Sequence, residues 1–246
     1  MQTFYFTDPG KVRSHNEDSV TIINNENNEF VLAIADGMGG HKAGEVASSI
    51  AIEHITKSFY NLETIGNKDD AIEWLRQIVK EINDKIFDYA NKNPESKGLG
   101  TTLVIAIKTD DYILYGNIGD SSGYVIKNGI LHKVTKDHTY VGMLISNGRL
   151  TEEGAKNHPG KNLLTRALGA NNPIDIDIFD IDTSVKGLFL CSDGLTNMVT
   201  VEQIEKILNS NLSIEEAVVK LIKKANSRGG TDNISIAYLK KESGEL

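Results

Sequence analysis

Apolar runs and periodic apolar positions divide the chain into predicted strands and helices. Three strands are predicted near the start, at residues 2–7, 19–24 and 29–35. Later runs predict strands at 101–108, 112–117, 122–127, 130–134, 174–181 and 187–190, and a last strand that begins at Asp232. The dipeptide Asn128-Gly129 stands between two of these runs and is typical of a tight hairpin turn.

Helical periodicity indicates two pairs of helices. After Gly40, apolar and small residues recur on one helical face at positions 43, 46, 47, 50, 51 and 58, and His54 lies on the same face. A second stripe of this kind predicts a long helix over 69–91. Two capping boxes, in which a hydroxyl residue is followed three positions later by Gln or Glu, begin at Thr200 and Ser213 and predict two shorter helices.

The order of these elements predicts the fold class. Three strands, two helices, several strands, two helices and one strand do not alternate as they would around a doubly wound parallel sheet. Each helix has one wide apolar stripe, and the runs 31–35 and 188–190 are apolar on both faces. The sequence therefore predicts one α+β domain over residues 1–246, a four-layer α-β-β-α sandwich of two antiparallel sheets flanked by helix pairs.

Residues 138–168 interrupt this pattern. They are polar, contain glycine and are weakly helical, with Thr151 as a predicted N-cap. A segment of this length between strands of a compact domain is often a functional lid. We predict a flap there.

Composition and charge narrow the classes of function. The 246 residues carry a net charge of −8, which argues against a broad nucleic-acid surface. No apolar stretch approaches the roughly 20 residues needed to span a bilayer, and no signal-peptide pattern is present, so no membrane insertion is expected. The single Cys191 lies in an apolar run and reads as a buried hydrophobe, which favours a cytoplasmic protein without an intrachain disulfide. Nothing signals an assembly surface, and we expect a monomer.

Four apolar runs each meet an aspartate beside a glycine or an asparagine. These pairs are Asp36-Gly37, Gly119-Asp120, Asp193-Gly194 and Asp232-Asn233. Each pair alone is also a turn signal. Together, at the ends of strands in one sheet system, they predict an all-oxygen metal centre, because no His/Cys cluster at zinc spacing accompanies them. Such a centre favours Mn²⁺ or Mg²⁺, and two such cations can activate water for attack on phosphorus.

The turn at 10–18 adds a candidate for phosphate binding. Arg13 lies there, and its guanidinium fork fits two phosphate oxygens. A surface ion pair is the alternative, and the pattern alone favours it. The neighbouring Glu17-Asp18 is open to two readings as well, a part of the site or an ordinary acidic turn.

An ordered set of short motifs resembles one known family. In chain order they are Thr7-Asp-Pro-Gly-Lys-Val-Arg13, Asn16-Glu-Asp18, Ala35-Asp-Gly-Met-Gly-Gly-His41, Gly100-Thr-Thr102, Asn117-Ile-Gly-Asp-Ser121, Asp137-His138, Leu163-Leu-Thr-Arg-Ala-Leu-Gly169, Ser192-Asp-Gly-Leu195 and Thr231-Asp-Asn233. The set spans almost the whole chain. It is similar to the bacterial metal-dependent type 2C serine/threonine protein phosphatases, whose fold is the sandwich predicted above.

The resemblance implies a set of metal ligands. Asp36 would bridge two metals, the carbonyl of Gly37 would join the second, and Asp193 and Asp232 would hold the first. Asp120, together with Asp193, matches a third metal site of bacterial members.

The resemblance also implies the reaction and its partners. Arg13 matches the phosphate-binding arginine, and Asp18, with Glu17 beside it, matches an acid that acts at the edge of the site through water. The family hydrolyses phosphoserine or phosphothreonine in proteins with a metal-activated water and without a phosphoenzyme. The expected partners are phosphoproteins, including a serine/threonine kinase whose signalling the phosphatase reverses.

The chain departs from the family pattern at two positions. Met38 stands where animal members often have a histidine that serves as a proposed general acid. His41, His138 and a water on the third metal are the alternative proton donors, and His41 can equally be read as the first residue of a helix. Ser122 replaces a common arginine, which puts the third metal site in question.

The predicted flap supplies candidate substrate contacts beside the active site. Met143 is the first of these, and Ile145 and Arg149 are others. Two other classes compete with a phosphatase. One is a phosphatase-like regulatory module, which the retained carboxylates disfavour. The other is another two-metal hydrolase such as a nuclease, which the acidic balance and the lack of a basic stripe disfavour.

Overall fold

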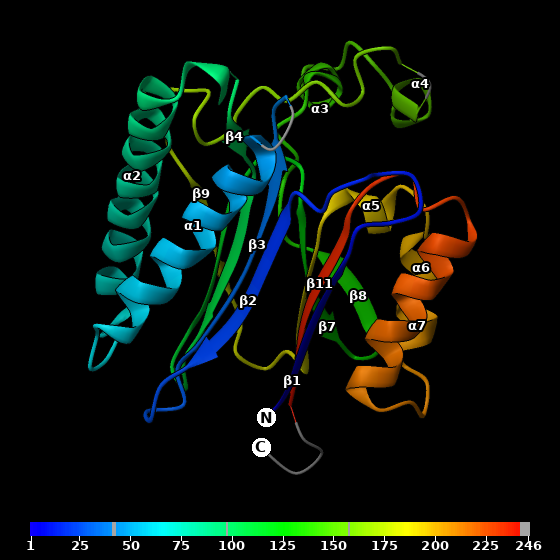
Figure 1. Cartoon of the computed structure of the whole chain (residues 1–246). Helices are drawn as coiled ribbons and strands as arrows, with labels where there is room; N and C mark the ends of the chain where they lie inside the picture. Colours follow the sequence, from blue (N-terminus) through cyan, green and yellow to red (C-terminus); the bar gives the residue numbers. More distant parts are fainter. Residues whose placement is uncertain (41–42, 97, 157, 242–246) are drawn as a thin grey trace.

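The computed structural model describes residues 1–40, 43–96, 98–156 and 158–241, which form two face-to-face β-sheets with helices outside each (Figure 1). All strand pairs are antiparallel. One sheet has the order β1 (Gln2–Asp8), β11 (Ile234–Lys240), β10 (Gly187–Cys191), β7 (Ser122–Lys127) and β8 (Ile130–Lys133). The other has the order β2 (Asp18–Asn24), β3 (Phe30–Met38), β5 (Leu103–Lys108), β6 (Ile113–Ile118) and β9 (Asp177–Ile181), and β4 (Gly100–Thr101) pairs with the end of β3.

Helix pairs cover the outer face of each sheet, as predicted. The pair on the β2-to-β9 sheet is α1 (Ala43–Tyr60) and α2 (Lys68–Lys92), and the pair on the other sheet is α6 (Val201–Leu208) and α7 (Ile214–Ser227). A 3₁₀ turn, η1 (Pro94–Ser96), follows α2, and a short helix, α5 (Asp193–Thr196), follows β10. No helix in the described ranges is both long enough and apolar enough to cross a membrane.

The apolar core has three layers, and β3 shows why. Val31 and Ala33 face the α1–α2 layer, whereas Leu32 and Ile34 pack between the two sheets. Successive side chains of a strand point to opposite faces. Asp36 therefore continues the inter-sheet side of β3, at the point where the strand leaves the core.

Strand pairing joins distant parts of the chain. The outer strand β1 pairs with β11 in a register that sets Gln2 opposite Lys240. The β7–β8 hairpin turns at Asn128 and Gly129, whose φ angles of 53° and 77° are those of a type I′ turn. The hairpin prediction is confirmed.

One of the two predicted capping boxes is present in the structure. Ser213 Oγ accepts a hydrogen bond from the N–H of Glu216, and Glu216 Oε2 accepts one from the N–H of Ser213. Thr200 is the N-cap of α6, but its side chain makes no capping hydrogen bond, so the capping box predicted there is wrong. A box built from Asn67 and Asp70 begins α2 instead, because Asn and Asp supply the same acceptors as Ser and Glu.

Two element boundaries also differ from the prediction. The last strand begins at Ile234, so Asp232 precedes it, and β9 begins at Asp177 rather than three residues earlier. The helix α5 was not predicted, because its four residues, which start at Asp193, are too few to show a period of 3.6.

The segment predicted as a flap lies above the ends of both sheets (Figure 1) and contains α3 (Tyr140–Ser146) and α4 (Glu152–Lys156). Gly154 N–H donates to Thr151 Oγ1 at 3.1 Å, which confirms the predicted cap. The two ends of the segment lie side by side, because Thr165 N–H donates to the carbonyl of His138 at 2.8 Å.

The two predicted capping boxes make a matched stability test. Ser213→Ala removes a capping acceptor and should lower the free energy of unfolding by about 1 kcal/mol. Thr200→Ala removes no capping bond and should change it by roughly 0.5 kcal/mol or less. Urea unfolding followed by circular dichroism measures both. Equal losses in the two variants would contradict the assignment of the caps.

Candidate active site

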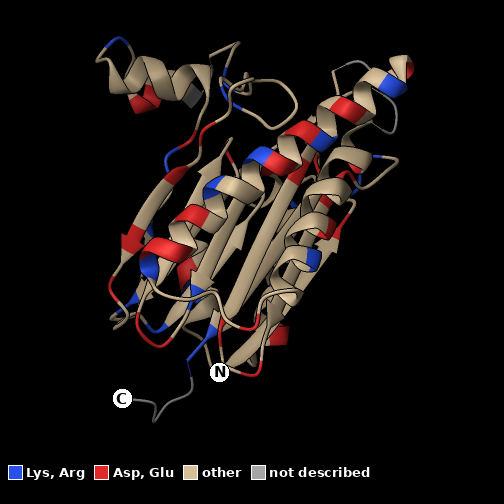
Figure 2. Cartoon of the chain, turned by 90° about the vertical axis from the view of Figure 1, so that its left-hand side faces the viewer, with Lys and Arg blue, Asp and Glu red and all other residues tan. Residues whose placement is uncertain are grey.

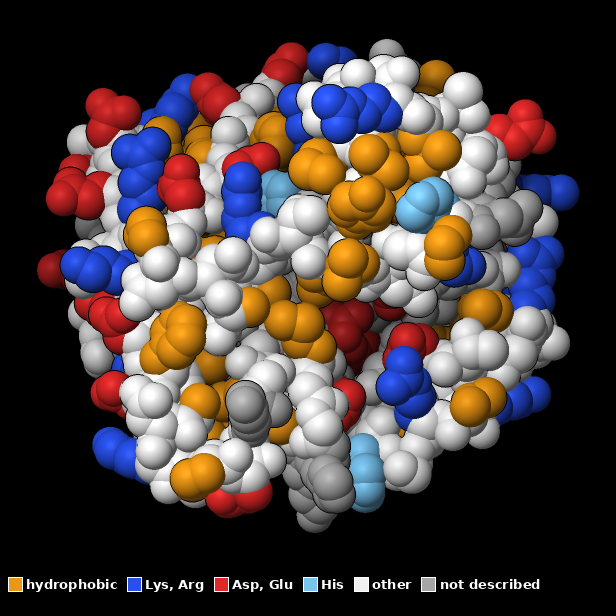
Figure 3. Space-filling model, turned by 90° about the horizontal axis from the view of Figure 1, so that it is seen from above, with side chains coloured by type: hydrophobic (Ala, Val, Ile, Leu, Met, Phe, Trp, Pro, Cys, Tyr) orange, Lys and Arg blue, Asp and Glu red, His pale blue; other side chains and the backbone are white. Residues whose placement is uncertain are grey.

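A cavity of about 560 Å³ opens where the inter-sheet core ends, and it collects the predicted acids. Its lining includes Asp36, Asp120, Asp193 and Asp232 together with Arg13. Gly37, Glu17 and the flap-side residues 162–167 line it as well. Seen from above, acidic side chains lie inside a hollow bordered by apolar groups (Figure 3). The convergence predicted from four separate strand ends is confirmed for this set of residues.

The Gly100-Thr-Thr102 motif holds the backbone of Asp36. Thr101 Oγ1 donates to the Asp36 carbonyl at 2.9 Å, and the Asp36 N–H donates to Thr102 Oγ1 at 3.0 Å. Thr102 Oγ1 is also hydrogen-bonded to Ser121 Oγ at 2.9 Å, beside Asp120. These hydroxyls therefore fix the two acids relative to one another, a role that the sequence analysis did not assign.

Asp18 links the two sheets. It lies on β2 directly opposite Asp36, and its Oδ2 accepts a hydrogen bond of 2.7 Å from Ser192 Oγ, which follows β10 in the other sheet. Its Oδ1 is buried and has no hydrogen-bond partner in the described part of the chain. Ser192 was missed from the sequence, where a serine before Asp-Gly carries no distinct signal.

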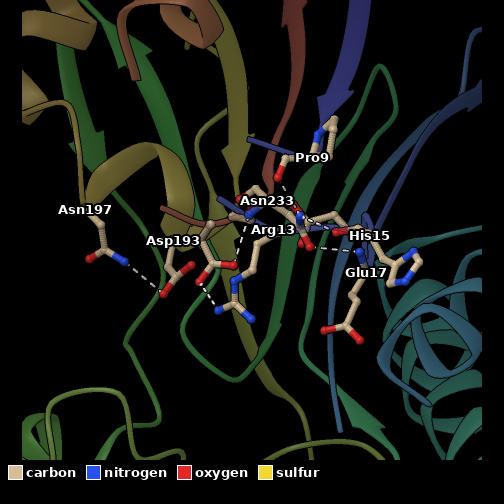
Figure 4. Close-up of polar contacts among 10 residues, drawn as sticks. Pro9, Arg13, His15, Glu17, Asp193, Asn197 and Asn233 are labelled. Atoms are coloured by element: carbon tan, nitrogen blue, oxygen red, sulfur yellow. Dashed lines mark hydrogen bonds and ion pairs between the residues drawn. The ribbon is translucent and has the colours of Figure 1, made fainter. Parts of the chain in front are cut away.

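Asp193 lies at the start of α5, where Asn197 Nδ2 donates to its Oδ2 at 3.0 Å (Figure 4). The next residue has to be glycine, because a Cβ at Gly194 would lie 2.0 Å from the Asn233 carbonyl oxygen. Close backbone packing therefore positions Asp193 beside the Asp232 segment.

Asn233 organises the loop that carries Arg13. Its Nδ2 donates to the carbonyls of Pro9 and His15, each at 2.9 Å, and its Oδ1 accepts the Glu17 N–H at 2.8 Å (Figure 4). The sequence motif contained this asparagine, but its role depends on contacts across more than 200 positions of the chain.

Arg13 points into the acidic site. Its Nη2 pairs with Asp232 Oδ2 at 2.9 Å, while 51% of the side chain stays exposed. The ion-pair reading of Arg13 is therefore correct, and the partner is one of the predicted metal ligands. The phosphate-binding reading of Arg13 stays a prediction.

Burial and mutual repulsion raise the pKa values of these acids. Burial raises the pKa of Asp120 to about 7 and that of Asp193 to about 6, and in each case a neighbouring aspartate adds to the rise. The pKa of Asp18 is raised to about 7 by burial, although serine hydrogen bonds oppose the rise. Burial and the charges of four other aspartates raise the pKa of Asp36 well above its usual range. The site therefore favours a bound positive charge.

The donors fit hard divalent cations rather than zinc. All of them are oxygens, and the orphaned Asp18 Oδ1 and the raised pKa values leave unsatisfied negative potential at the site. Within the described ranges, no group of three or more His, Cys, Asp or Glu side chains could hold a metal ion by itself.

Of the two histidines predicted as proton donors, the structure describes only His138. His138 has both ring nitrogens engaged, because Gly119 N–H donates to its Nδ1 at 3.1 Å and its Nε2 lies 3.1 Å from Asp177 Oδ2. With Nδ1 as an acceptor, the proton on Nε2 is held by Asp177, so the structure argues against His138 as the donor. His41 lies outside the described residues.

The flap residues nearest the cavity differ from those singled out in the sequence. The cavity lining includes Leu163 and Arg166, whereas Met143, Ile145 and Arg149 are not among the lining residues. Met143 is exposed on α3 and stays a predicted substrate contact. Ser122 is buried in β7 and does not line the cavity.

Comparison with known proteins decides the family. The family model for protein phosphatase 2C matches residues 11–226. The chain belongs to this family. Among curated relatives, the serine/threonine phosphatase stp of Listeria monocytogenes is 39% identical over 243 residues, covering 98% of this chain and 96% of the relative. Protein phosphatase PhpP of Streptococcus pneumoniae is 34% identical over 240 residues, covering 97% of each chain.

Solved structures agree with this protein phosphatase 2C assignment. The serine/threonine phosphatase of S. agalactiae has a TM-score of 0.93 at 32% identity and covers 98% of this chain and 99% of its own. The Mycobacterium tuberculosis phosphatase PstP/Ppp has a TM-score of 0.86 at 34% identity with the same coverage. The protein is thus a serine/threonine protein phosphatase of a generally metal-dependent family, as the sequence resemblance implied, and the nuclease alternative is wrong.

Burial of the acids, together with their mutual repulsion, predicts how stability depends on pH without metal. The pKa of Asp120 is raised in the folded state, so the folded protein holds that proton more tightly, and stability is lost as pH rises from about 4 to about 7. Asp120→Asn cannot ionise and should be more stable than the wild type at pH 8, by on the order of 2–4 kcal/mol. Urea unfolding in chelator at pH 5 and pH 8 measures the difference. A gap that does not grow with pH would refute this explanation.

Proposed function

We propose that this phosphatase uses two divalent cations, Mn²⁺ or Mg²⁺, bound by Asp36, Asp193 and Asp232, with the Gly37 carbonyl as a further ligand. The observation that carries the proposal is the convergence of acids from separate strands on one cavity, where burial and mutual charge raise their pKa values. Asp120, which shares the cavity with Asp193, is the protein ligand proposed for a third ion.

Bound cations would supply an ionised water for in-line attack on phosphorus and would neutralise the phosphate charge. Asp18 is not among the residues that line the cavity, but it lies opposite Asp36, and its buried Oδ1 has no partner in the described ranges, which supports a role through water. Glu17 does line the cavity, and burial raises its pKa, which suits a group that accepts a water-mediated hydrogen bond.

Arg13 is proposed to bind the phosphate. A guanidinium has five N–H donors, and the contact with Asp232 uses only Nη2 among the described hydrogen bonds of Arg13. Arg13 lines the acidic cavity, and its remaining donors would match two phosphate oxygens. Asp232 holds the arginine in place while substrate binds.

The leaving serine or threonine oxygen needs a proton. Because His138 is committed to Gly119 and Asp177, the donors that stay in the proposal are His41 and a water near Asp120. The proposed substrates are phosphoproteins of serine/threonine kinase signalling, including a kinase. We propose a monomer, as expected from the sequence.

Removal of one proposed ligand tests the mechanism. Asp193→Ala should reduce phosphate release from a phosphothreonine peptide at least about 100-fold, because the cations would lose a charged ligand. Titration with Mn²⁺ and with Mg²⁺ measures the metal dependence, and Asp84→Ala, an exposed acid on α2, is the control. Wild-type activity that persists in excess chelator would refute the metal-dependent mechanism.

Substitution of Arg13 tests the phosphate site. Arg13→Ala should raise KM for the same peptide roughly 10- to 100-fold, as expected for charged hydrogen bonds of about 1.5–3 kcal/mol. Arg13→Lys should recover part of the loss, because lysine keeps the charge but not the fork. Arg76→Ala on α2 should change nothing. If Arg13→Ala and Arg76→Ala behave alike, Arg13 does not bind the phosphate.

A further inference from the structure

A second groove, of about 650 Å³, runs between the polar faces of α6 and α7. Its lining residues are Gln203, Lys206, Ile207 and Ser210 on the α6 side and Lys220, Lys223, Lys224 and Ser227 on the α7 side. In each set the positions recur at i, i+3, i+4 and i+7, so each helix turns one continuous face into the groove.

The groove is basic in an acidic protein. No acidic residue is among its described lining, and none of its four lysines makes an ion pair with any described residue. Two acids of the same helices have other hydrogen-bond partners: Glu205 accepts the N–H of Leu131, and Glu216 completes the α7 capping box. The corresponding groove on α1 and α2 includes Glu53 and Asp88 among its lysines, and charges of both signs are interspersed on that face (Figure 2).

Helix stability does not account for this arrangement. Lys206 and Lys224 lie in the last turns of their helices, where they stabilise the helix dipole. Lys220 lies outside the last turn of α7, and it has lysines at i+3 and i+4, a spacing at which like charges destabilise a helix. Glu216, four residues before Lys220, offsets part of this repulsion, and a bound anionic partner would offset more of it.

The groove also has an unmet hydrogen-bond acceptor. Gln203 Oε1 is buried and has no partner in the described ranges. Because this oxygen is buried, the Gln203 amide would have to turn toward the groove to use it, and a peptide N–H could then serve as its donor, whereas an inorganic anion could not. The concave shape likewise fits an extended chain better than a flat membrane surface.

We propose that the α6–α7 groove docks an acidic segment of the phosphoprotein substrate, outside the catalytic cavity. The net charge of −8 repels anionic substrates at long range. The four unpaired lysines make the electrostatic potential of the groove positive. The groove ends at Ser227, and residues 228–231 alone separate it from Asp232 in the active site. Docking would therefore raise the local concentration of the phosphorylated residue. This inference rests on the proposed function.

Kinetics on tailed substrates test the docking. A phosphothreonine peptide is joined by a Gly/Ser spacer to a tail rich in Asp and Glu, or to a neutral tail of the same length. Spacers of about 6, 12 and 18 residues reach from roughly 13 to 23 Å. The acidic tail should lower KM about 10-fold at the best spacer length without changing kcat, and added salt should reduce the gain.

Charge reversal identifies the surface. The double variant Lys220→Glu/Lys223→Glu should abolish the gain while activity on para-nitrophenyl phosphate stays unchanged. Lys80→Glu, an exposed lysine on α2, is the matched control and should keep the gain. Equal KM values for both tails in the wild type, or an equal loss in the control, would overturn the proposal.

Binding without catalysis separates this proposal from the mechanism. A fluorescent, unphosphorylated acidic peptide should bind the wild type and not the double variant, whether or not the protein is active. Absence of such binding in a protein that hydrolyses the untailed phosphopeptide refutes the groove and leaves the mechanism intact. Lysine-dependent binding to phosphatidylserine vesicles, with no binding of the peptide, would assign the groove to a membrane surface instead.

Discussion

The apolar layer between the sheets ends in carboxylates, and the rest of the structure follows from this junction. Leu32 and Ile34 pack between the sheets, and the next residue on that side of β3 is Asp36. Burial deprives its charge of water, and other acids surround it. Ionised groups held this close destabilise the protein unless a positive charge joins them. The extensive apolar layers on both sides of each sheet offset that repulsion.

Short hydroxyl side chains keep the acids in place. Ser192 joins Asp18 across the sheets, and Thr102 joins the Asp36 backbone to the loop of Asp120. Positions fixed before substrate arrives are what electrostatic catalysis needs, since no rearrangement is required during the reaction. The same rigidity explains why the acids cannot move apart to relieve their repulsion.

The features that could be predicted from the sequence are those set by local patterns, whereas those set by distant contacts could not. Periodicity identified the long helices and the inward acids, because burial of one face imposes a repeat over many residues. Asp36 and Asp193 could be found as acids at the ends of apolar runs. Asn233 and Ser192 could not, because their roles depend on partners far away in the sequence. The missing bond at Thr200 and the short α5 show the other limit: local motifs allow several geometries, and packing selects one.

The pairing of β1 with β11 has a consequence for synthesis on the ribosome. Asp18 and Asp36 emerge early and sit on one antiparallel pair, whereas Asp232 and Asn233 belong to the segment that leads into β11. The Arg13 loop takes its hydrogen bonds from Asn233, so it stays unanchored until that segment has left the ribosome. Contacts of such long range form late. A nascent chain therefore carries the acids of β2 and β3 without the assembled site, and the enzyme becomes competent only after Asp232 and Asn233 have been synthesised.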